Sequence, residues 1–90
     1  MVRVVRYDYY KSTRRGKKLM VEVSGRTIHF GDSNMKQFKD KTGIWRKKNH
    51  GDDKRRDSYL ARSKGIKDGS GKLTWTNPKS PNYHSIRVLW

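Results

Sequence analysis

Apolar positions in the first third of the chain follow the short, alternating pattern of β-strands. Residues 2–10 are rich in valine and tyrosine and predict one strand. Residues 19–23 predict a second strand and residues 27–30 a third, and the glycine at position 25 suits a tight hairpin turn that needs positive φ. We therefore expect a β-hairpin, and in its last strand we expect His29 to face away from the core.

A basic helix is predicted over residues 52–65, the segment with the most complete start and stop signals. Asp52 or Asp53 can accept hydrogen bonds from the free N–H groups of the first turn, and Gly65 can adopt the left-handed conformation that ends a helix. Most side chains between these ends are cationic, and the apolar seam is formed by Tyr59, Leu60 and Ala61. We expect this seam to face the sheet.

A second helix is predicted near the end of the sequence, over residues 81–88. Ser80 is the expected cap, and Pro81 stands at the first helical position, where its missing N–H costs nothing. We expect His84 on this helix to be partly exposed. The helix can cover the sheet with an apolar stripe formed by Tyr83, Ile86 and Trp90.

The connecting segments carry weaker patterns. Residues 11–18 are expected to form a basic turn or loop, and residues 35–38 an irregular turn. Residues 39–49 are expected to form a loop anchored by Ile44 and Trp45, and residues 72–76 a short edge strand. Together these patterns predict an α+β fold. It is a small antiparallel sheet of about three strands with a central hairpin, packed against one or two helices, in a single domain over residues 1–90.

Charge narrows the possible partners. The 90 residues include 23 Lys and Arg against 8 Asp and Glu, which gives a formal net charge of +15. So much positive charge in a small chain repels itself unless an anionic partner neutralises it, and nucleic acid is the first candidate. We expect DNA rather than RNA, and we expect no membrane partner because there is no long apolar run. Cysteine is absent, which excludes disulfides and thiolate metal sites.

Phosphate contacts are predicted from three basic clusters that could form one continuous patch. These clusters lie in the turn before the hairpin, before the basic helix and on that helix. They comprise Arg14, Arg15, Lys17, Lys18, Lys47, Lys48, Lys54, Arg55, Arg62 and Lys64. Arg56 is assigned a structural role because Asp52 lies four residues earlier on the same helix face.

Aromatic residues could add stacking on unpaired bases where they are exposed. The candidates for stacking are Tyr9, Tyr10, Trp45 and Trp75. In a chain this small, Trp45, Tyr59, Tyr83 and Trp90 are also the residues expected to complete the core.

The order of several short motifs resembles a known family. The motifs are residues 17–21 (KKLMV), residues 27–31 (TIHFG), His50 with the acidic and basic residues of 52–62, and the closing residues 88–90 (VLW). They resemble a family of small basic proteins of unknown function encoded by tailed phages and by large DNA viruses of eukaryotes, over roughly residues 12–90. The resemblance implies a viral or phage origin and supplies no catalytic residues.

An enzymatic alternative rests on His29, His50 and Asp53. A hairpin followed by a helix, with histidines near the junction, is the layout of metal-dependent endonucleases of the ββα type, in which histidine activates water. The competing interpretation makes His29 an outward strand residue, His50 part of the helix start and Asp53 a cap. We expect no cofactor.

The function predicted from the sequence is nucleic-acid binding largely without sequence specificity. A structural virion protein that contacts the capsid or packaged genome is the first alternative, and the endonuclease is the second. Viral structural or replication proteins are possible further partners. The expected location is the host cytoplasm, the nucleus for a eukaryotic virus, or the virion interior.

Overall fold

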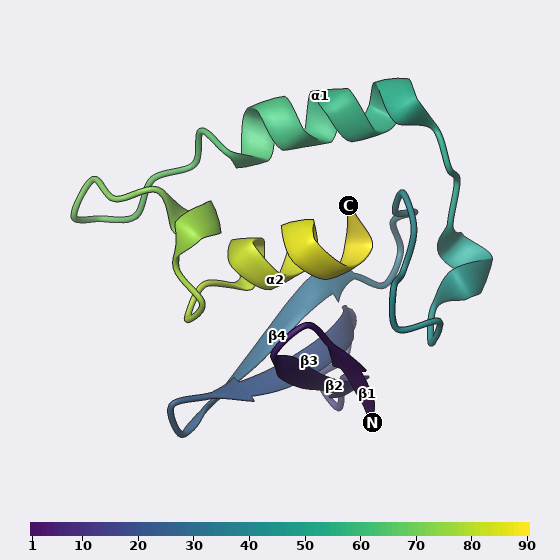
Figure 1. Ribbon diagram of the computed structural model, residues 1–90, viewed down its shortest axis with the longest axis horizontal. Helices are drawn as coiled ribbons and strands as arrows, with labels where there is room; N and C mark the ends of the chain where they lie inside the picture. Colours follow the sequence, from purple (N-terminus) through teal and green to yellow (C-terminus); the bar gives the residue numbers. More distant parts are fainter.

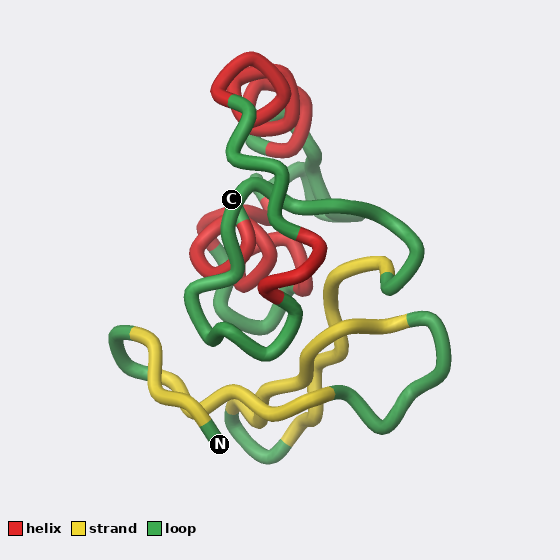
Figure 2. The backbone as a smooth tube through the Cα atoms, turned by 90° about the vertical axis from the view of Figure 1, so that its right-hand side faces the viewer, coloured by secondary structure: helices red, strands yellow, loops and turns green.

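The sheet has four antiparallel strands in the order in which they follow one another along the chain. The computed structural model describes residues 1–90, with β1 (Val2–Val4), β2 (Tyr7–Lys11), β3 (Lys17–Val23) and β4 (Arg26–Asp32) in the order β1-β2-β3-β4 (Figure 1). Both helices lie on one side of this sheet (Figure 2). The α+β prediction is confirmed, but the number of strands is four and not three.

The single first strand predicted over residues 2–10 is wrong, because the chain reverses in its middle. Val4 pairs with Tyr7, so that Val5 and Arg6 form a two-residue hairpin turn. Val5 has a φ of 58°, whereas Arg6 keeps a negative φ, which is the pattern of a type II′ turn. A β-branched residue stands where glycine is usual, so the sequence carries no turn signal at this point.

Replacing Val5 with glycine should therefore stabilise the protein. A non-glycine residue in this conformation is strained by roughly 1–3 kcal/mol, and the valine side chain is 65% exposed, so its removal sacrifices little burial. After the entropic cost of glycine, we expect a gain of about 1 kcal/mol in the free energy of unfolding, measured by urea denaturation. Val5→Ala keeps the Cβ atom and should gain less. A loss of stability in Val5→Gly would contradict strain at this turn.

The hairpin between β3 and β4 is confirmed. Ser24 (φ 51°) and Gly25 (φ 78°) form its two-residue turn, and Val21 pairs with Ile28 in the ladder. β4 continues to Asp32, two residues beyond the predicted end. At Gly31, where φ is 78°, a Cβ atom would lie 2.8 Å from Leu89 Cδ1, so glycine allows the last helix to approach the strand.

The last helix, α2 (Pro81–Leu89), covers the sheet. The Ser80 hydroxyl accepts a hydrogen bond from the N–H of Asn82, and Pro81 occupies the first turn, as predicted. The core that this helix closes is formed by Tyr9, Leu19, Val21, Val23, Ile28, Phe30, Val88 and Leu89.

His84 belongs to this interior, and the prediction that it is partly exposed is wrong. The ring is fully buried, with Nε2 2.6 Å from Pro78 O and Nδ1 2.8 Å from the Tyr9 hydroxyl. A carbonyl oxygen can only accept, so Nε2 carries the proton and Nδ1 accepts from Tyr9. Burial lowers the pKa of His84, and it raises the pKa of Tyr9.

The basic helix, α1 (Asp53–Ser63), begins and ends where predicted, but it does not end through a left-handed glycine. The Asp52 carboxylate accepts hydrogen bonds from the N–H groups of Lys54 and Arg55, at 3.0 and 3.3 Å. At the other end, Lys64 is the C-cap in a right-handed conformation and Gly65 follows it directly, so the helix ends where predicted; Gly65 has no positive φ, and its predicted left-handed conformation is wrong. No helix in the structure combines the length and apolar character needed to cross a membrane.

α1 packs on α2 and forms an outer layer, so the prediction that its apolar seam faces the sheet is also wrong (Figure 1). The Tyr59 ring stacks on Trp90 with centroids 4.0 Å apart and planes 6° apart, and its hydroxyl lies 3.0 Å from Ser85 Oγ. Arg56 donates from Nε to the main-chain oxygen of Trp90 at 2.8 Å, and not to the carboxylate of Asp52. Arg56 therefore has a structural role, but its partner is Trp90 and not Asp52.

The segment between β4 and α1 is organised around the buried amide of Gln37. Its Nε2 donates to Trp45 O at 2.8 Å and to Asn49 Oδ1 at 2.7 Å, and Trp45 Nε1 donates to Lys18 O at 2.7 Å. A short 3-10 helix, η1 (Arg46–Lys48), precedes α1. The edge strand predicted over residues 72–76 is instead a second 3-10 helix, η2 (Thr74–Thr76).

Candidate nucleic-acid interface

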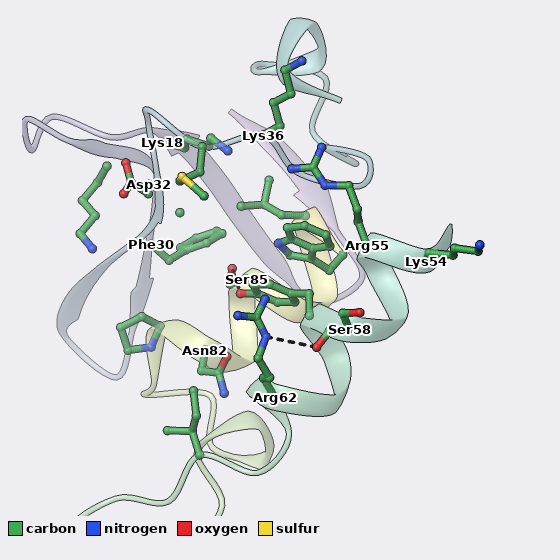
Figure 3. A pocket seen from close by; sticks show the side chains of 18 residues that line it. Lys18, Phe30, Asp32, Lys36, Lys54, Arg55, Ser58, Arg62, Asn82 and Ser85 are labelled. Carbon is green, nitrogen blue, oxygen red and sulfur yellow. Dashed lines mark hydrogen bonds between the residues drawn. The ribbon is translucent and has the colours of Figure 1, made fainter. Parts of the chain in front are cut away.

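A groove of about 630 Å³ lies between α1, α2 and the end of β4 (Figure 3). The face of α1 that borders it carries Arg55, Ser58, Tyr59 and Arg62, whose spacing of three, four and seven positions places them on one side of a helix. The ring of Tyr59 stacks on Trp90, and this contact keeps α1 away from the sheet.

Positive charge dominates the lining of this groove. Asp32 is its only acidic side chain, and its cations come from β3, from the segment after β4 and from α1; they are Lys17, Lys18, Lys36, Lys54, Arg55 and Arg62. None of these cations forms an ion pair, since the one salt bridge in the structure joins Arg3 to Asp8 elsewhere. The groove therefore carries a concentrated positive potential that an anionic partner would neutralise.

Two of the six cations, Lys54 and Lys18, do not present their charged group to the open groove. Lys54 points away from the groove in Figure 3. Lys18 is buried, and its ammonium group donates a hydrogen bond to Gln37 Oε1. The pKa of Lys18 is lowered to about 8, mainly because the group is buried and secondly because the positive charge of Lys48 lies nearby. We therefore leave Lys18 out of the surface contacts, although its charge contributes to the potential of the groove wall.

The other predicted contact residues lie outside the groove. Arg14 and Arg15 are exposed in the turn between β2 and β3, and Lys47 and Lys48 belong to η1. The ammonium of Lys64 lies 5.1 Å from the centroid of the Trp75 ring. The structure thus brings together half of the ten predicted residues: Lys17, Lys18, Lys54, Arg55 and Arg62.

Lys36 is the groove cation that sequence reasoning missed. It stands in the polar segment expected to be an irregular turn, and only the approach of that segment to α1 brings it to the same groove as Arg55. Of the aromatic residues considered for stacking, Tyr9 is buried and Tyr10 is 42% exposed.

The three residues of the enzymatic alternative do not form one cluster. His29 lies on the outer face of the sheet, with Nδ1 2.7 Å from Ser12 Oγ. His50 accepts a hydrogen bond at Nδ1 from the N–H of Asp52, and Asp53 is the first residue of α1. No group of three or more histidine or acidic side chains is arranged to hold a metal ion.

The fold and the groove define a small α+β protein whose concave surface carries unpaired positive charge. Residues 7–63 match a family of unknown function, DUF5754, and the chain belongs to this family. The resemblance to a family of unknown function is thereby confirmed. No curated protein and no solved structure matches the chain.

Proposed function

We propose that this protein binds nucleic acid through phosphate contacts in the groove, largely without sequence specificity. The observation that carries the proposal is the convergence of Lys17, Lys36, Arg55 and Arg62 on a groove with one acidic side chain and no ion pair. Lysine and arginine that neutralise phosphates release condensed counterions, which supplies affinity without regard to sequence.

A polymer fits this arrangement better than a single small anion. The cations belong to separate elements on different sides of the groove, with Lys17 and Lys36 near the sheet and Arg55 and Arg62 on α1. Repeated phosphates along a chain can meet such distributed charges in turn. DNA is the polymer we expect first.

The family resemblance adds a biological context to the proposal. A viral or phage accessory protein that acts on the genome, in the host cell or inside the virion, would need this kind of sequence-independent affinity. Recovery of the protein at high copy in purified particles would favour the structural virion role instead.

Binding should weaken steeply with salt. If Lys17, Lys36, Arg55 and Arg62 contact phosphates, log K should fall against log salt with a slope of about −3 to −4, or about 100-fold between 50 and 200 mM. Fluorescence anisotropy with duplexes of unrelated sequence measures this, and affinities should agree across sequences. Affinity that does not change with salt, or no binding near physiological salt, would overturn the proposal.

A further inference from the structure

The groove has an apolar part that phosphate contacts alone do not explain. We propose that it takes an unpaired nucleotide, with the base lying on this apolar lining and the neighbouring phosphates on the cations. This inference rests on the proposed function and deepens it, because it names single-stranded nucleic acid as the preferred partner class.

The apolar lining includes two side chains that are largely exposed to solvent. Met35 is 58% exposed and Ile66 is 51% exposed, and both line the groove. The partly exposed Tyr59 and Trp90 line it as well. Planar bases bury such surface favourably, and aromatic rings provide stacking that tolerates any base on the face that the stack of Tyr59 on Trp90 leaves free.

The groove is large enough for a single nucleotide but not for a double helix. Its volume of about 630 Å³ falls in the range of sites that hold small organic ligands. In a duplex the bases stack on one another and the phosphates lie outside, so that a duplex can offer only its backbone to this concavity. A paired base would have to leave its stack first, which is energetically unfavourable.

Polar side chains of the lining are largely engaged within the protein, which favours tolerance of any base. Ser85 Oγ lies 3.0 Å from the hydroxyl of Tyr59, and Asn82 donates from Nδ2 to Ser63 O at 2.7 Å. Few groups therefore remain to read the hydrogen-bonding edge of a base. The groove would recognise the presence of a base and not its identity.

Three probes at one salt concentration test the inference: an oligothymidylate, an abasic oligonucleotide with the same number of phosphates, and a duplex with the same number of phosphates. One stacked base contributes roughly 1–3 kcal/mol, so the oligothymidylate should bind about 5- to 150-fold more tightly than the abasic chain. The duplex should resemble the abasic chain. Equal affinity for all three probes would overturn the inference and leave the proposed function standing, whereas no binding to any probe would overturn the proposed function itself.

A pair of variants assigns the effect to the groove. Met35→Ser with Ile66→Ser changes only exposed side chains, and should reduce the preference for oligothymidylate over the abasic chain towards equality. Affinity for the abasic chain should stay unchanged. Ile44→Ser with Leu73→Ser is the matched control, because both residues are 37% exposed and lie outside the groove. An unchanged preference in the groove variant, or an equal loss in the control, would overturn the inference.

Discussion

Replacing Arg55 and Arg62 together with glutamate should weaken nucleic-acid binding by about 100-fold or more near 100 mM salt. Each lost phosphate contact lowers the magnitude of the salt slope by about one, and the two new carboxylates repel the phosphates as well. Both arginines are exposed, and the favourable effect of a negative charge in the first turn of α1, at position 55, offsets the unfavourable effect of one in the last turn, at position 62. The fold should therefore persist, and anisotropy titrations over a range of salt concentrations measure the loss.

The matched control for this variant is Lys72→Glu with Lys79→Glu. Both lysines are exposed and lie outside the groove. This double substitution changes the net charge by the same amount as the double substitution of Arg55 and Arg62. We expect a loss of about tenfold or less, from the weaker long-range field alone. If both pairs weaken binding equally, net charge and not the groove would account for the affinity.

Replacing His84 with alanine should cost about 3–4 kcal/mol of stability, the largest effect that we expect from a single substitution outside the groove. The change empties the space of a fully buried ring that contacts Tyr9 and Phe30, and it leaves the Tyr9 hydroxyl buried without its partner. Urea denaturation measures the loss. Tyr9→Phe removes only the donor to Nδ1 and should cost about 1–2 kcal/mol. A loss below 1 kcal/mol in His84→Ala would contradict the buried hydrogen-bonded arrangement.

The same histidine should make stability depend on pH. Its pKa in the folded state lies below that in the unfolded state, so the unfolded chain takes up a proton first as the pH falls. The neutral His84 therefore contributes fully to the free energy of unfolding above about pH 6.5. Below that pH the free energy of unfolding falls by up to about 1.4 kcal/mol per pH unit. The pKa values of His29 and His50 are lowered as well, so their contributions have the same sign. Between pH 7 and 5.5, His84→Gln should show a smaller slope than the unmodified protein.

Local signals in the sequence predicted those features that depend on neighbouring residues. Asp52 caps α1, and Ser80 and Pro81 start α2, because a cap needs only a side-chain oxygen and free N–H groups two or three residues away. The β3–β4 hairpin follows from Gly25 and the alternation on either side of it.

Features set by tertiary packing could not be predicted in this way. Val5 adopts a positive φ because the pairing of β1 with β2 imposes it, against the preference of valine. His84 is buried because Tyr9, 75 positions away, supplies its partner. The groove depends on the approach of Lys36 to Arg55, which requires α1 to rest on α2 and not on the sheet.

The most direct test of the central claim follows the amide resonances of isotope-labelled protein by NMR as an oligothymidylate is added. If the groove is the binding site, the largest changes should map to its lining, at Lys17, Met35, Arg55, Arg62 and Ile66. Changes concentrated on the outer sheet face around Tyr10 and His29, or in the turn at Arg14 and Arg15, would contradict it.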